Sequence, residues 1–172
     1  IKSQGLKVSK DDLYLWADYI CNIFMFIRIS KYDRSLIKEQ KSLDKYYCID
    51  NGMRGAVLMP QSNDNGKNLE NTVFMQLNRM RLPTDKITYY QGNCECDFVL
   101  QREDSVIQLI QVTWDMVDES TREREVKGLL EAASVTGCEN LIIITKDTEN
   151  IFVRDGREIR VIPAWKWLLQ NN

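Results

Sequence analysis

The 172-residue sequence contains no histidine. This absence excludes Ser–His and Cys–His nucleophile pairs, acid–base catalysis by imidazole, and zinc sites with imidazole ligands. A metal ion would have to be held by oxygen or thiolate ligands. The five cysteines are scattered and form no CxxC pair, which is typical of free cysteines in a reducing compartment. Cys94 and Cys96 form a CxC, but no second pair completes a zinc site.

The sequence also lacks a signal peptide and an apolar run close to the about 20 residues of a membrane span. We therefore expect a cytoplasmic protein with no membrane partner. A net charge of −2 disfavours a broad surface for nucleic acid but is compatible with a local basic groove. The length fits one domain plus a small appendage. Ile1 in place of an initiator Met predicts that the sequence is a fragment.

Residues 1–59 predict the N-terminal appendage. Ser9 is the expected N-cap of a helix that continues to Phe24, with apolar residues at helical spacing. Residues 25–29 are β-like, and Lys45–Asp50 predicts a short strand. A helix followed by a ribbon fits either the end of a winged-helix element or a plain docking arm, and the periodicity does not choose between the two.

Residues 60–172 predict the main domain, with the loop-like stretch 60–68 as its boundary. The expected elements are a helix over 67–80, strands over 87–91, 95–100 and 106–113, a helix over 120–136, a strand over 140–145, a hairpin of 150–154 and 158–162, and a helix over 163–169. This α-β-β-β-α-β order predicts an α/β fold with a mixed sheet. The short loops predict that the strands over 87–91, 95–100 and 106–113 are neighbours, with 87–91 and 95–100 antiparallel. The strand over 106–113, the helix over 120–136 and the strand over 140–145 should form a right-handed parallel crossover. In the last helix, Trp165 and Leu168 are expected to be buried.

Three polar side chains interrupt otherwise apolar elements: Glu70 on the first helix of the main domain, Asp97 on its second strand and Gln111 on its third. Thr113 lies two residues after Gln111 and therefore points to the same face. Hard oxygen ligands that converge on one point could hold a divalent cation for phosphodiester hydrolysis. Isolated buried carboxylates are costly, so these groups must find partners or a cation.

Structural roles compete with this interpretation at each position. Asp97 could accept backbone N–H bonds, as buried carboxylates in strands do. Glu70 could favour the dipole at the start of its helix. Gln111 could be an amide whose hydrogen bonds are satisfied within the sheet, and the tryptophans are expected to pack in the core or an interface.

Five segments share their residues and spacing with a known family: Lys45-x-Tyr47…Asp50-x-Gly52, Gly66-x-x-Leu69-Glu70-Asn71-x-Val73, Tyr90…Glu95-x-Asp97-Phe98-Val99, Gln111-Val112 and Thr121-x-x-Arg124-Glu125-x-x-x-Leu129. Together they resemble the C-terminal domain of a family of bacterial and archaeal AAA-type ATPases. In that family a winged-helix-like segment precedes a domain of the PD-(D/E)xK nuclease superfamily. The resemblance covers most of the chain and implies a restriction-endonuclease-like core with a winged-helix-like appendage.

The resemblance implies that Glu70, Asp97, Gln111 and Thr113 occupy the catalytic positions, with the first three as ligands of Mg²⁺ or Mn²⁺. The departure is at residues 111–113, where Gln-Val-Thr replaces (D/E)xK and removes both an acidic ligand and the lysine. Lys127 is a candidate substitute. Whether the domain is an enzyme stays open: the expected function is a degenerate module that binds DNA or a partner, and the alternative is an active endonuclease. This sequence has no G-x-x-x-x-G-K-[ST] loop. The ATP site that the resemblance implies would therefore lie in an upstream ATPase domain of the same chain. A homo-oligomer is a further expectation.

Overall fold

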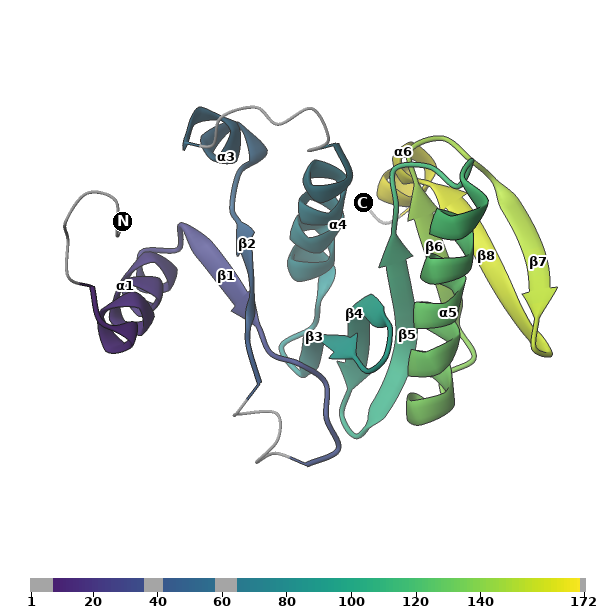
Figure 1. Ribbon diagram of the computed structural model, residues 1–172, viewed down its shortest axis with the longest axis horizontal. Coiled ribbons are helices and arrows are strands. Elements are labelled where there is room, and N and C mark those ends of the chain that lie inside the picture. The colour runs from purple at the N-terminus through teal and green to yellow at the C-terminus, as the bar shows by residue number, and fades with distance from the viewer. Residues whose placement is uncertain (1–7, 36–41, 58–64, 171–172) are drawn as a thin grey trace.

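The computed structural model describes residues 8–35, 42–57 and 65–170. Its elements, in chain order, are α1 (Lys10–Asn22), β1 (Phe26–Ile29), β2 (Lys45–Cys48), α3 (Asn51–Val57), α4 (Asn65–Met80), β3 (Asp85–Gln91), β4 (Glu95–Arg102), β5 (Ser105–Val112), α5 (Glu119–Thr136), β6 (Leu141–Thr145), β7 (Asn150–Arg154), β8 (Arg157–Pro163) and α6 (Ala164–Gln170). Figure 1 shows the elements from α1 to α3 on one side of the molecule and β7 on the other. The elements from α4 to β6 follow the predicted α-β-β-β-α-β order.

The main sheet has six strands in the order β3-β4-β5-β6-β8-β7. β3, β4 and β5 are antiparallel neighbours, as the short loops predicted, and the turn before β5 uses a positive φ at Glu103. β6 runs parallel to β5, which confirms the predicted β-α-β crossover. β8 continues parallel to β6, and β7 closes the hairpin over Asp155-Gly156. The fold is therefore α/β with a mixed sheet.

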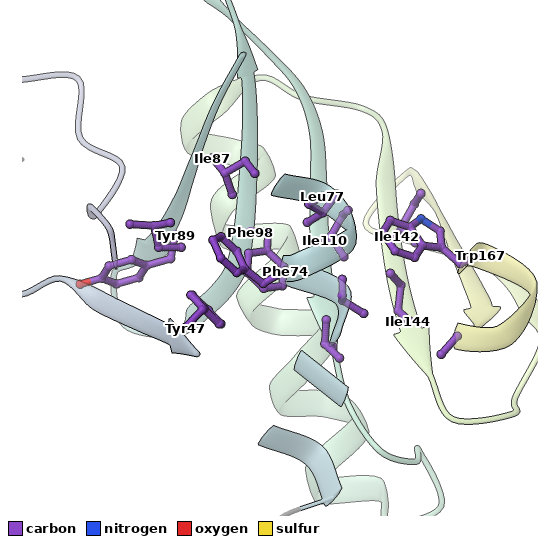
Figure 2. Packing of buried hydrophobic residues seen from close by; sticks show 14 residues of the cluster. Tyr47, Phe74, Leu77, Ile87, Tyr89, Phe98, Ile110, Ile142, Ile144 and Trp167 are labelled. Atoms are coloured by element: carbon purple, nitrogen blue, oxygen red, sulfur yellow. The ribbon is translucent and has the colours of Figure 1, made fainter. Parts of the chain in front are cut away.

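Helices cover both faces of this sheet, so β4 and β5 lie in the middle of a layered structure. One apolar core joins the sheet to α4 and α6, and its central residues are drawn in Figure 2. A second core joins the opposite face to α5. Gly128 on α5 lies where a Cβ atom would come within 2.0 Å of the Glu95 carbonyl oxygen, so this glycine permits the close approach of α5 to β4.

A second sheet, made of β1 and β2, attaches the N-terminal part to the main domain. Tyr47 on β2 stacks on Phe74 of α4, with ring centroids 4.1 Å apart. The buried amide of Asn71 on α4 accepts from the Cys48 N–H at 2.9 Å and donates to the Cys48 carbonyl at 2.8 Å. This carboxamide satisfies the backbone of β2 as a neighbouring strand would.

The structure corrects several details of the sequence prediction. The first helix of the main domain begins at Asn65, within the expected loop, of which residues 60–64 lie outside the described part. Asp118 caps α5, which therefore begins at Glu119, one residue before the predicted helix over 120–136. In α6, Trp165 is 59% exposed and Trp167 is buried instead. The capping box at Ser9 confirms the start of α1, but none of the residues of α1 is buried. Among the described helices, none combines the length and apolar character needed to cross a bilayer.

Candidate functional site

Three separate elements bring the predicted site residues to one pocket. On α4, Glu70 precedes Val73 and Phe74 by three and four residues and therefore shares their inward face. Phe98 of β4 pairs with Ile110 of β5, and this register places Asp97 opposite Gln111. The pocket has a volume of about 680 Å³, and its lining includes Glu70, Asp97, Gln111 and Thr113. The structure thus brings all four predicted residues together.

Lys45, at the start of β2, places its ammonium group among the carboxylates of this pocket. Its Nζ lies 3.2 Å from Asp97 Oδ1 and 3.4 Å from Glu70 Oε1, and it also pairs with Glu95. The same Nζ lies 5.3 Å from the ring centroid of Tyr89. Because the Lys45 side chain is 23% exposed, water screens these interactions only in part. One ammonium is therefore shared by three acidic side chains.

Burial disfavours the charged forms of both Lys45 and Asp97, and the neighbouring charges decide the net shift of each pKa. Burial lowers the pKa of Lys45, but the charges of Asp97, Glu70 and Glu95 outweigh it and leave this pKa above its usual range. Burial, followed by the charge of Glu70, raises the pKa of Asp97 to about 7, although Lys45 acts in the opposite direction. Asp97 is the most deeply buried of the three carboxylates, so it is the one least favoured as an anion. Lys45 stays charged while Asp97 can take up a proton near neutral pH.

Tyr47 adds a hydrogen bond to Glu70 from the same strand that supplies Lys45. Its hydroxyl donates to Glu70 Oε1 at 2.7 Å. Burial, and then the charge of Glu70, raises the pKa of Tyr47, so the phenol remains a donor. The Glu70 carboxylate is thus held by two side chains of β2. Because α4 begins at Asn65, Glu70 lies beyond its first turn and does not have the expected role at the helix start.

Gln111 connects β4, β5 and α5 through its amide. Its Oε1 accepts from the Asp97 N–H at 3.1 Å, and its Nε2 donates to the buried carboxylate of Glu125. The Val112 N–H donates to Asp97 Oδ2 at 2.9 Å. Glu125 also pairs with the exposed Arg124 at 2.6 Å. The amide and Asp97 therefore have the structural partners that the competing interpretation expected, in addition to Lys45.

Thr113 and three further side chains also line the pocket, and Lys127 lies outside it. The Thr113 hydroxyl donates to the Asp115 carbonyl at 3.0 Å, in the turn that follows β5. Lys67, Arg124 and Trp114 line the mouth of the pocket. Lys127 is exposed and lines a different hollow, with Asn93 and Glu131, so it does not replace the missing lysine.

The residues present do not fit a divalent cation in this arrangement. Lys45 lies within ion-pair distance of Glu70, Glu95 and Asp97, and the oxygen of Gln111 already accepts a hydrogen bond. Across residues 8–35, 42–57 and 65–170, no set of three or more acidic or cysteine side chains is arranged to hold a metal ion. The Lys45 ammonium therefore supplies the positive charge that these acidic side chains need, in the place that a metal cation would take.

Lys45, Tyr47 and Glu95 belong to the family pattern, but the sequence alone does not assign them to the site. Two carboxylates within apolar elements need a positively charged partner, and this need could have identified Lys45, which begins a short strand. Glu125 was harder to place, because the Arg/Glu-rich sequence of α5 is typical of a solvated helix face.

The fold and site define an α/β protein with a mixed sheet and a partly buried lysine–carboxylate cluster. The chain is similar to an uncharacterised protein of Methanocaldococcus jannaschii, with 30% identity over 98% of this chain and 38% of that protein. It is also similar to an uncharacterised protein of Haemophilus influenzae, with 27% identity over 99% of this chain and 40% of that protein. The chain thus spans about two fifths of the length of these curated relatives. No family model matches, and no solved structure matches.

Proposed function

We propose that this chain is the C-terminal module of an AAA-type ATPase and has a restriction-endonuclease-like core of the PD-(D/E)xK type. In this proposal the core no longer cleaves nucleic acid and instead binds DNA or a protein partner. A cytoplasmic location and an ATP site elsewhere in a longer protein belong to the same proposal. The greater length of both relatives supports a modular role.

Convergence of the site residues supports the nuclease-like ancestry. Glu70, Asp97 and Gln111 come from a helix and two adjacent strands, yet they line one pocket. Asp97 and Gln111 are joined by a hydrogen bond, and Glu70 reaches Asp97 through Lys45. Apolar residues alone would have filled this position at lower cost, because burying charge requires compensation.

The observation that favours a silent site is the position of the Lys45 ammonium. It pairs with all three carboxylates and offsets part of their negative charge from within the protein, and Gln111 is hydrogen-bonded to Asp97 and Glu125. Neither an acid nor a lysine of the (D/E)xK pattern stands at 111–113, where the sequence is Gln-Val-Thr. In this proposal, the cluster of Lys45 and its three carboxylates therefore has a structural role and not a catalytic one.

DNA binding would use the mouth of the pocket. Lys67 provides positive charge there, and so does Arg124, although its guanidinium also pairs with Glu125. The ring of Trp114, which has Lys146 over it at 5.6 Å, provides a second surface for a base. A protein partner would use α1, whose exposed apolar side chains are Leu13, Tyr14, Leu15, Trp16 and Tyr19. Exposed apolar patches of this kind mark interaction sites.

Two measurements test the proposal. Cleavage of single-stranded, duplex and branched DNA with Mg²⁺ or Mn²⁺ is expected to be absent, both for the wild type and for Asp97→Ala. Fluorescence anisotropy is expected to show salt-dependent DNA binding that Lys67→Ala and Arg124→Ala each weaken, with a salt slope lower by about one. Lys127→Ala, an exposed change outside the pocket, is the matched control. Equal binding by all three variants would contradict a role of the pocket mouth.

An active divalent-metal endonuclease is the second candidate, because Glu70, Asp97 and Gln111 line one pocket. It requires a Mg²⁺ or Mn²⁺ ion to displace Lys45 from these side chains. Cleavage by the wild type that Asp97→Ala abolishes, together with binding heat in a Mn²⁺ titration, would establish this candidate and overturn the silent site.

A further inference from the structure

The two edges of the six-stranded sheet are treated differently. At the β3 edge, the chain itself adds a partner: the Tyr32 N–H donates to the Tyr89 carbonyl at 2.6 Å, and the Tyr89 N–H donates to the Ser30 carbonyl at 3.2 Å. At the other edge, β7 pairs with β8 on one side, and among the described residues no segment pairs with its other side. Unpaired N–H and C=O groups on an edge strand are a template for another strand.

β7 is short and ends in Arg154, but it lacks other features that protect natural edge strands. Its five residues, Asn-Ile-Phe-Val-Arg, contain no proline and no lysine, and they pair with β8 in an unbroken register without a bulge. Ile151 and Val153 point to the same face and are 63% and 67% exposed. An edge strand without a bulge and with two exposed β-branched side chains is suited to pairing.

We propose that β7 joins two copies of this chain edge to edge, in an antiparallel arrangement with two-fold symmetry. Side chains alternate between the two faces of a sheet along each strand. In a two-fold symmetric pairing, the side chains of two paired residues therefore lie on the same face only when their numbers are both odd or both even. A register centred on Phe152 then places Ile151 opposite Val153 of the second copy. Arg154 comes opposite Asn150, so no two like charges face each other within the strand.

The ends of this ladder are compatible with the same register. Beyond the paired residues, Asp155 of one copy approaches Glu149 of the other. Lys166 on α6 already pairs with Glu149 and would supply the positive charge between these two acids. The strand is therefore self-complementary in shape and charge, which is what an isologous contact between two copies requires.

The test is the association of the protein in solution, and it is independent of DNA binding and cleavage. Sedimentation velocity between about 1 μM and about 1 mM should show a concentration-dependent dimer of twice the 20.2 kDa chain mass. The double variant Ile151→Lys/Val153→Lys should weaken dimerisation by at least about tenfold, because the register places each lysine opposite a lysine of the second copy. Both positions are exposed, so the thermal melting of the monomer should stay unchanged.

A charge-paired variant tests the register. Ile151→Lys/Val153→Glu places a lysine opposite a glutamate twice in the proposed dimer, so it should recover most of the lost affinity. Val117→Lys, at a residue that is 91% exposed before α5, is the control that should dimerise like the wild type. A wild type that stays monomeric, a Lys/Lys variant that still dimerises, or a Lys/Glu variant no stronger than Lys/Lys would each overturn the proposal. Pairing of β7 with a strand of an unrelated protein, while the chain itself stays monomeric, would overturn it as well.

Discussion

Replacing Lys45 with methionine removes the ammonium group from the carboxylate cluster and keeps the length of the apolar stem. Glu70, Glu95 and Asp97 would then face one another without their positive partner. Removing one member of a buried ion pair costs about 3 to 5 kcal/mol, and the partial exposure of Lys45 places this case near the lower value, at about 3 kcal/mol. We therefore expect a loss of about 3 kcal/mol in the free energy of unfolding at about pH 8.

The loss should depend on pH with a definite sign. Because the pKa of Asp97 is raised to about 7 from its usual 3.8, its contribution to stability is fully present below about pH 4 and is lost as the pH rises through about 7. In the variant, the carboxylates can relieve their repulsion only by taking up protons. The loss should therefore shrink at about pH 5, where protonation is easier.

Urea unfolding followed by circular dichroism measures both values. Lys127→Met is the matched control, because Lys127 is exposed and lies outside the pocket, and it should change stability by less than about 0.5 kcal/mol. A loss below about 0.5 kcal/mol for Lys45→Met at about pH 8, or an equal loss at both pH values, would refute the assignment of Lys45 as the counter-charge of the cluster.

Three further changes probe the same region. Asp97→Asn should keep the fold intact or stabilise it at about pH 8, by up to about 4 kcal/mol, and should flatten the pH dependence between about 4 and about 7; a large drop in melting temperature would show that the carboxylate is required as an acceptor. Gln111→Glu sets a carboxylate against Glu125 and should lower the unfolding free energy by about 2 kcal/mol in urea titrations at about pH 8, with recovery in acid; an unchanged midpoint would contradict the observed amide contact. Gly128→Ala should cost about 1 to 3 kcal/mol by the same measurement, because its Cβ would meet the backbone of Glu95, and a neutral result would show that α5 can shift away.

Much of the fold could be predicted because its signals are local. Apolar spacing located the helices and the strands, the short loops indicated antiparallel pairing, and Gly137 marked the end of α5 with φ 76°. The prediction was weakest where an element is short. In the seven residues of α6, periodicity cannot decide which tryptophan faces inward, and packing against α4 and the sheet buries Trp167.

The site was predictable in part for the same physical reason. Polar residues within apolar strands are conspicuous, so Asp97 and Gln111 could be recognised from sequence alone. Lys45 could not be placed there, because it lies 52 residues before Asp97 and reaches it only through the docking of β2 on α4. Its single positive charge, among the other lysines of the N-terminal part, has no local pattern that assigns it to the pocket.

The two-point contact between Asn71 and Cys48 has a consequence for proton balance. It fixes β2, and therefore Lys45, against a helix that contributes one of the acids. Any motion that lifts β1 and β2 from the main sheet would withdraw the ammonium and leave the acids to bind hydrogen ions from solution. Attachment of the small sheet is thus linked to the release of protons. Calorimetry in buffers of different ionisation enthalpy would measure the protons released and would therefore detect this attachment.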